Sequence, residues 1–185
     1  MRKQVIWLIL VSVLMTIFLF FDYQLLLLID LIKFSALNSF FSVLLFIQSE
    51  PYYEIWLLLF MLILMLTIKE KNRFPKFMLA FAVAAFVNLA LKNIFSRPRP
   101  IGGLESGQGK SFPSGHSTLI FTTLPFLEKK TIKFIWTIFT FLLVFARVYF
   151  KIHFLSDIAA GFILGYGSAF LFKELNLKRT KKDAR

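Results

Sequence analysis

Long apolar stretches, separated by short polar and basic segments, follow one another along most of the chain. A helix needs about 20 residues to cross the hydrocarbon core of a bilayer. The pattern predicts six membrane-spanning helices, at about 5–21, 52–68, 77–95, 114–127, 132–150 and 157–172. The stretch 114–127 fits this prediction least well, because it is short and contains Pro125, which ends or kinks a helix.

The first stretch is longer than the apolar region of a signal peptide, which has about 7–15 residues, and no Ala-x-Ala-like site follows it. We therefore expect it to be retained as a helix. The next segment, 22–50, contains apolar residues interrupted by polar ones. We interpret it as a pair of amphipathic segments lying along the bilayer surface, since an even number of spans keeps both termini on one side. The alternative is one more, distorted span.

The composition indicates a membrane protein. Of the 185 residues, 58% are hydrophobic, whereas soluble domains are about half apolar. The length suits a single domain, 1–185, so the expected fold is all-α, an integral membrane helical bundle. The chain has no cysteine, which excludes disulfides and thiolate metal sites.

The net charge is +12, but the basic residues occur in short runs between apolar stretches, which is typical of membrane topology rather than of nucleic-acid binding. Fifteen of the 22 Lys and Arg residues lie at the termini, including a basic tail at 173–185, or on the loops 69–76 and 128–133. The positive-inside rule places these segments in the cytoplasm. We therefore expect a protein of the cytoplasmic (inner) membrane with both termini cytoplasmic. The loops 92–113 and 147–157 then face the extracytoplasmic side.

Three basic residues of these outward loops, Lys92, Arg99 and Arg147, provide fixed positive charge near the membrane surface. Arginine binds phosphate oxygens with paired donors, and lysine supplies a point charge. Three neighbouring cations repel one another unless an anion lies among them, and they repel a metal ion as well. The pattern favours an anion site with no metal and no other cofactor. The alternative is that the three side chains extend to lipid headgroups.

The tetrapeptide Pro113-Ser114-Gly115-His116 precedes an apolar stretch and has the composition of a helix start. Backbone N–H groups at a helix start bind anions, and a glycine allows a ligand to approach the backbone. The alternative is an ordinary helix cap with no ligand.

His153 and Asp157 are four residues apart, so on a helix they share one face. A carboxylate on one imidazole nitrogen fixes the tautomer and raises the nucleophilicity of the other nitrogen. The alternative is that Ser156-Asp157 only caps the last helix and that His153 is a passive interfacial residue; Asp157 can also do both. His116 has no evident carboxylate partner, and Glu105 is a candidate only because it is near in the sequence.

These motifs, Lys92…Arg99-Pro100, Pro113-Ser114-Gly115-His116 and Arg147…His153…Asp157, resemble the three-part signature of the type 2 phosphatidic acid phosphatase superfamily. The resemblance covers residues 92–157 and the layout of six spans. One position departs from it, because the family usually has serine where this chain has Ala146. We expect this change to have a modest effect on rate.

The resemblance implies a role for each motif residue. His153 would attack phosphorus and form a phosphohistidine, Asp157 would orient His153, and His116 would protonate the leaving oxygen and then activate water. The ligands of the phosphoryl oxygens would be Lys92, Arg99, Ser114, the Gly115 amide and Arg147.

The implied function is that of a metal-independent lipid phosphatase, with undecaprenyl diphosphate, phosphatidylglycerol phosphate, phosphatidic acid and lipid A phosphate as candidate substrates. The alternatives are a lipid-to-lipid phosphotransferase and, less favoured, a non-enzymatic transporter or lipid-binding protein, which would not need His153 with Asp157. Gly161 and Gly165 form a Gly-x-x-x-Gly pattern, which permits close helix contact within the chain or in a dimer. We therefore expect a monomer or weak dimer whose partners are the bilayer and its lipids.

Overall fold

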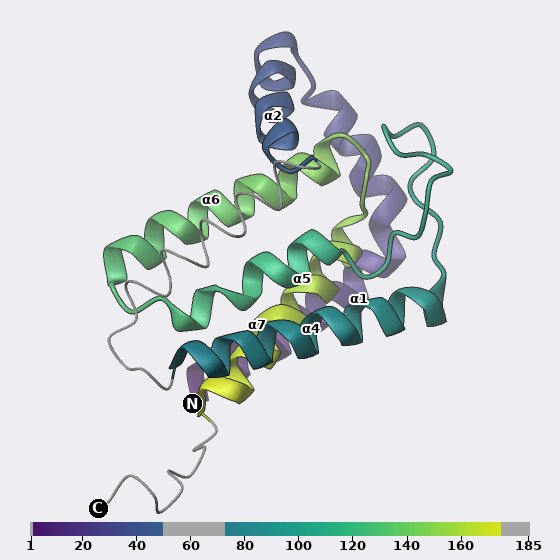
Figure 1. The fold of residues 1–185 in the computed structure, drawn as a ribbon. Helices are drawn as coiled ribbons and strands as arrows, with labels where there is room; N and C mark the ends of the chain where they lie inside the picture. The colour runs from purple at the N-terminus through teal and green to yellow at the C-terminus, as the bar shows by residue number, and fades with distance from the viewer. Residues whose placement is uncertain (1, 50–72, 175–185) are drawn as a thin grey trace, which may run out of the picture.

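The structure is a computed structural model that describes residues 2–49 and 73–174, and every regular element in these two ranges is a helix (Figure 1). The elements, in chain order, are α1 (Arg2–Leu31), α2 (Ser35–Ile47), α4 (Arg73–Phe95), α5 (Gly115–Thr122), the short 3₁₀ helix η1 (Leu124–Phe126), α6 (Lys130–Tyr149) and α7 (Leu155–Glu174). The prediction of an all-α integral membrane helical bundle is confirmed.

Four of these helices are long and apolar enough to cross a membrane. They are Val5–Leu31 within α1, and the whole of α4, α6 and α7. The last three match the spans predicted at 77–95, 132–150 and 157–172. The span predicted at 52–68 lies outside the described residues.

The span predicted at 114–127 does not form one continuous helix. It consists of α5, with 8 residues, followed by the 3 residues of η1, and Pro125 lies within η1. At 1.5 Å per residue, an α-helix of this length covers about 12 Å, less than half of the hydrocarbon core. The helix α5 is enclosed by protein, with Ser117, Thr118, Phe121 and Thr122 buried, and the chain continues past it to Pro125 and Glu128 at the opposite end of the bundle.

The interpretation of segment 22–50 as two surface segments is wrong for residues 22–31, which belong to α1. Helix α1 continues without a break to Leu31, because Asp22 does not end it and the residues that follow are strongly apolar. The second half is α2, a 13-residue apolar helix that packs along α6 and is too short to cross a bilayer by itself.

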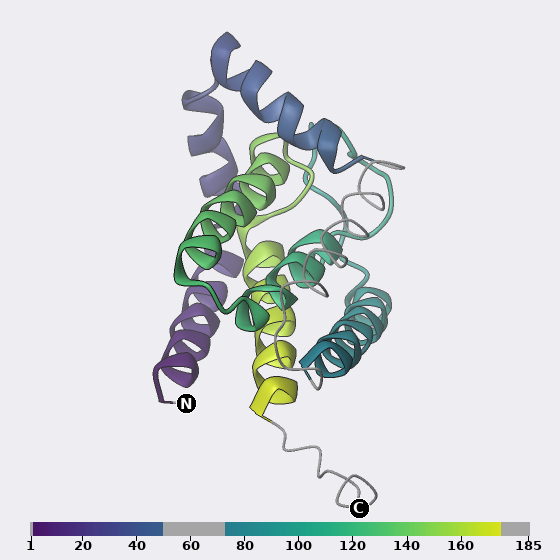
Figure 2. The ribbon, with the colours of Figure 1, turned by 60° about the vertical axis from the view of Figure 1, so that its left-hand side comes forward.

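Helix α7 occupies the centre of the bundle and packs against α1, α4 and α5 (Figures 1 and 2). Its glycines allow the close approach of α5. A Cβ added at Gly161 would lie 2.7 Å from the Ser117 Cβ, and one added at Gly165 would lie 2.0 Å from the Thr118 carbonyl oxygen. The Gly-x-x-x-Gly pattern therefore serves packing within the chain.

The loops between the helices gather at two opposite ends of the bundle. At one end, Arg73 forms an ion pair with Glu128 at 2.9 Å, and the Lys173 Nζ donates to the Pro125 carbonyl at 2.5 Å. The beginning of α1 and the end of α7 also lie at this end (Figure 2). At the other end, Lys151 pairs with Asp30 at 2.5 Å, close to the turn between α1 and α2. The three motifs of the sequence lie toward this second end.

Candidate active site

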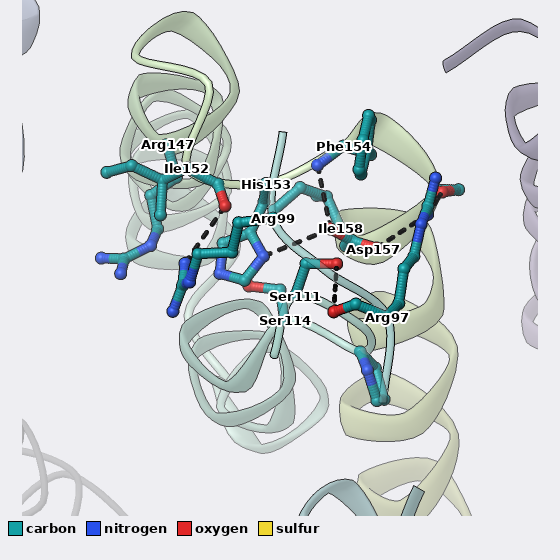
Figure 3. A network of polar contacts seen from close by, with 12 residues as sticks. Arg97, Arg99, Ser111, Ser114, Arg147, Ile152, His153, Phe154, Asp157 and Ile158 are labelled. Atoms are coloured by element: carbon teal, nitrogen blue, oxygen red, sulfur yellow. Dashed lines mark hydrogen bonds and ion pairs between the residues drawn. The ribbon is translucent and has the colours of Figure 1, made fainter. Parts of the chain in front are cut away.

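The loop between α6 and α7 holds His153 against a carboxylate from the first turn of α7 (Figure 3). The His153 Nδ1 lies 3.3 Å from the Asp157 Oδ2, and the same oxygen accepts a hydrogen bond of 2.9 Å from the Phe154 backbone N–H. Both side chains are buried. Because a carboxylate only accepts, Nδ1 carries the hydrogen in this contact, and the lone pair of the neutral ring then lies on Nε2.

Burial lowers the pKa of His153 well below the ordinary value, and the positive charges of Arg147, Arg99 and Lys92 lower it further. A hydrogen bond with the Ser111 backbone acts in the opposite direction and is the smaller influence. His153 is therefore a neutral imidazole at neutral pH, the form that has a lone pair to donate.

Two arginines lie beside His153, and both are tied to its loop. The carbonyl of Arg147, in the last turn of α6, accepts hydrogen bonds from the Ile152 N–H at 2.8 Å and the His153 N–H at 3.3 Å. The Arg99 Nη1 donates to the Ile152 carbonyl at 3.1 Å (Figure 3). The backbone that positions His153 is thus fixed by the two residues whose charges surround it.

Lys92 comes from the last turn of α4, on the other side of the site. The Lys92 Nζ donates to the Lys110 carbonyl at 2.9 Å. Its charge also interacts electrostatically with those of Arg99, Arg147 and Asp157. The three predicted cations therefore lie within electrostatic reach of one another, as an anion site requires.

The second motif begins α5 and is hydrogen-bonded to the third. Ser114 is the N-cap, accepting from the Ser117 N–H at 3.4 Å, and its own backbone N–H donates to the Asp157 carbonyl at 3.1 Å. Gly115 follows as the first residue of α5. A Cβ added there would meet only the Asn88 Oδ1, at 3.6 Å, an ordinary contact distance. Protein packing therefore does not require glycine at this position.

His116 lies on the first turn of α5, with its Nε2 3.2 Å from the Gln48 carbonyl oxygen at the end of α2. Because a carbonyl only accepts, Nε2 carries the hydrogen in this contact, and Nδ1 gains or loses the proton when the ring titrates. Burial lowers the pKa of His116 well below the ordinary value, and the charge of Arg147, and of His153 when it is protonated, lowers it further. The two imidazoles are therefore close enough to influence each other's protonation.

Its position in the sequence made Glu105 a candidate carboxylate partner for His116, but in the structure Glu105 pairs with two arginines instead. Its carboxylate lies 2.9 Å from the Arg99 Nη1 and 3.8 Å from the Arg147 Nη2. A carboxylate of the chain itself thus lies beside two of the three predicted cations. The loop that carries it is tied down where the Leu104 N–H donates to the Phe150 carbonyl at 3.2 Å.

Sequence reasoning missed two pairs of polar residues around the site. Arg97 and Asp22 lie behind Asp157, and the Asn88 amide donates to the Thr118 Oγ1 at 2.8 Å, joining α4 to α5. One signal was available for Asp22 and Asn88, because a polar residue inside an apolar helix requires a partner.

These observations define a helical membrane protein in which a buried imidazole–carboxylate pair and a second imidazole are surrounded by basic side chains. The PAP2 superfamily model matches residues 75–181, which is more than half of the chain, and the chain belongs to this superfamily.

Two curated proteins from Bacillus are similar in sequence. The chain is 33% identical to phosphatidylglycerophosphatase B of Bacillus subtilis (strain 168) over 115 residues, which are 55% of this chain and 57% of that protein. It is 31% identical to the bacitracin transport permease protein BcrC of Bacillus licheniformis over 129 residues, 64% of each chain. The matched region spans less than two thirds of the length of each relative.

Two solved structures share the fold. A transmembrane PAP2-type phosphatidylglycerolphosphate phosphatase from Bacillus subtilis superposes with a TM-score of 0.73 at 22% identity, covering 98% of this chain and all of that one. LpxE of Aquifex aeolicus superposes with a TM-score of 0.66 at 25% identity, covering 83% of this chain and 95% of that one.

Proposed function

We propose that the chain is a metal-independent lipid phosphatase that works through a phosphohistidine on His153. One observation carries the proposal: a buried imidazole is held by Asp157 on a loop whose backbone is hydrogen-bonded to Arg99 and Arg147. A passive interfacial histidine needs neither the carboxylate nor the arginines. Phosphoryl transfer requires a positioned nucleophile and neutralised oxygens, and this arrangement supplies both.

In the proposed reaction, the lone pair on the His153 Nε2 forms a bond to phosphorus while the bond from phosphorus to the lipid oxygen breaks. The Nδ1–H of protonated His116 gives its proton to that oxygen. Lys92, Arg99, Arg147, the Ser114 hydroxyl and the Gly115 N–H hold the phosphoryl oxygens. Water then gives a proton to the His116 Nδ1 and attacks phosphorus, the P–N bond breaks, and inorganic phosphate leaves.

His116 needs a proton for the first step, although burial and positive charge lower its pKa. The negative charge of the bound phosphate raises the proton affinity of the imidazole beside it. We therefore assign the protonation of His116 to the substrate complex rather than to the free protein.

A lipid substrate fits the surroundings of the site. The loop that carries Glu105 also exposes Ile101 and Leu104, which are 83% and 63% accessible. Such side chains suit the membrane interface, where a phosphate can reach the arginines while the lipid chains stay in the bilayer. One similar protein is named a phosphatidylglycerophosphatase, which makes phosphatidylglycerol phosphate one candidate beside the other lipid phosphates and diphosphates expected from the sequence.

The placement in the membrane is part of the proposal. With the termini and the basic loops at one end of the bundle in the cytoplasm, the site faces the extracytoplasmic side of the inner membrane. The whole chain is proposed to act as one domain, as a monomer or weak dimer.

The test is release of inorganic phosphate from a panel of lipid phosphates and diphosphates by the purified chain, in detergent with excess chelator. We expect release to persist with chelator and to disappear in His153→Ala, while Glu128→Gln, at the opposite end, keeps it. Loss of activity on chelation would overturn the metal-independent mechanism. Transfer of phosphate to a second lipid, with no free phosphate released, would instead show a phosphotransferase.

A further inference from the structure

Behind the proposed catalytic pair, one guanidinium joins two buried carboxylates that come from different helices. The Arg97 Nη2 lies 2.8 Å from the Asp22 Oδ2 on α1. The Arg97 Nη1 lies 3.0 Å from the Asp157 Oδ1 on α7 (Figure 3). Asp22 is 2% exposed and Asp157 is fully buried. The Arg97 guanidinium also stacks on the Phe154 ring, 3.9 Å from its centroid.

Ser156 completes this connection. Its backbone N–H donates to the Asp22 Oδ1 at 3.1 Å, its hydroxyl donates to the Asp22 Oδ2, and the Arg97 Nη1 donates to the same hydroxyl at 2.7 Å. Asp22 therefore accepts hydrogen bonds from both Arg97 and Ser156. These contacts fasten α1 to the beginning of α7, one residue before Asp157.

The connection determines how Asp157 can use its two oxygens. The Asp157 Oδ1 accepts a hydrogen bond from Arg97, while Oδ2 accepts from the Phe154 N–H and lies beside the His153 Nδ1. A buried carboxylate stays ionised and in one orientation only when charge and hydrogen bonds compensate its desolvation. Arg97 supplies that charge from the side of Asp157 away from the proposed phosphate ligands. Asp22 binds the Arg97 Nη2 and so fixes the orientation of the guanidinium.

We propose that Arg97 and Asp22 are positioning residues, which act through Asp157 to hold the Nδ1–H tautomer of His153. Neither belongs to the motif residues given a role by the family resemblance, and Asp22 lies outside the matched region. The proposal rests on the proposed function in one respect, that His153 is the nucleophile.

The first test measures kcat and KM for Asp22→Asn and Arg97→Gln in the full chain. We expect kcat to fall by about ten- to a hundredfold, as when an outer partner of a functional imidazole is lost. KM should change less than about threefold, since the phosphate ligands remain in place. The double variant should be no slower than Arg97→Gln, because both changes act through one contact. Arg97→Lys should recover part of the rate.

A matched control is available on the same helix. Asp30 is also an α1 carboxylate with a basic partner, Lys151, but this pair lies at the exposed surface. Asp30→Asn should keep kcat within about twofold of the unsubstituted chain, as expected for an exposed ion pair. A loss in Asp30→Asn equal to that in Asp22→Asn would overturn the proposal, because it would reflect a general need for acidic residues on α1.

The second test does not depend on activity. The chain has two histidines, so ¹⁵N-histidine spectra contain two imidazoles, and His116→Gln assigns them. We expect His153 to be the Nδ1–H tautomer in the unsubstituted chain and a mixture of tautomers in Arg97→Gln. If the chain hydrolyses no lipid phosphate, the proposed function fails. The tautomer measurement still shows whether Arg97 positions His153 through Asp157.

Ser156→Ala provides a milder change if the charged variants do not fold. It removes one hydroxyl from the connection and leaves both ions, so we expect a smaller fall in kcat than for Asp22→Asn, again with little change in KM. The proposal is overturned if the folded variants keep both the kcat and the His153 tautomer of the unsubstituted chain. It is equally overturned if KM rises while kcat is unchanged, because Arg97 would then be a substrate ligand.

Discussion

The carboxylate of Glu105 lies 2.9 Å from the guanidinium of Arg99, in the region where the phosphate of a substrate is proposed to bind. It is also 3.8 Å from Arg147, so it partly neutralises the two arginines that flank His153. We expect a phosphate that binds to these arginines to displace this carboxylate, so that Glu105 competes with the substrate.

Removing this competitor should strengthen anion binding. For Glu105→Gln, we expect the inhibition constant of inorganic phosphate and the KM of a lipid monophosphate to fall by up to about fivefold, the range for one partly exposed ion pair. The measurement is steady-state kinetics at fixed ionic strength. Glu128→Gln, which breaks the Arg73 pair at the opposite end, is the control. A higher inhibition constant for phosphate would show that Glu105 assists binding.

His116 should matter more for a poor leaving group than for a good one. A lipid alkoxide needs a proton as it leaves, whereas a lipid phosphate leaves more easily. In His116→Ala, we expect kcat to fall by about a hundredfold or more on a lipid monophosphate and by clearly less on a diphosphate with the same lipid chain. Equal losses on the two substrates would argue against His116 as the acid.

Both imidazoles should titrate on the acid side of an ordinary histidine. Burial and the charge of Arg147 lower the pKa of His153 and of His116 in the folded protein. Each ring should stay neutral as the pH falls through about 6.5 and gain its proton only at lower pH. The measurement is an imidazole titration by ¹⁵N NMR, with a histidine peptide as reference. A midpoint at or above 6.5 for either ring in the free protein would contradict this.

The glycines of the site and of the bundle should respond differently to an added methyl group. Gly115→Ala should leave the melting temperature nearly unchanged and lower kcat/KM, because the new Cβ meets only an ordinary contact with Asn88. Gly161→Ala places its Cβ 2.7 Å from that of Ser117, so it should destabilise the protein by about 1–3 kcal/mol. Thermal unfolding in detergent, together with kinetics, separates the two effects. A clear loss of stability in Gly115→Ala would remove the ligand-based reason for glycine there.

Relationships close in sequence were predictable. The spacing of His153 and Asp157 pointed to a contact, and the structure places Nδ1 and Oδ2 at 3.3 Å, although His153 lies in the loop before α7 and not on the same helix. Asp157 also accepts the Phe154 N–H near the beginning of α7, so it fulfils the capping interpretation at the same time. The start of a helix at Ser114 was predictable for a similar reason, since N-cap chemistry is local.

Relationships between distant segments were not predictable in the same way. Asp22 looked like the end of the first helix, because an acidic residue after an apolar stretch usually meets water. In the structure, Arg97 and Ser156 provide its partners, and α1 continues for more than two turns. A periodic pattern does not reveal such a partner across 75 residues. The short helix α5 was overestimated for a related reason, since apolar residues enclosed by protein resemble those that face lipid.

The contact between Asp22 and Arg97 has a consequence for how the protein comes into being. Every signature residue is found from Lys92 onward, yet the ion that faces Asp157 is anchored by α1, which is synthesised before all of them. Grafting the motif-bearing half onto another scaffold would carry over the whole signature and leave that anchor behind. The reaction centre should mature only when α1 and α7 dock, so that catalytic competence reports on assembly of the helices in the bilayer.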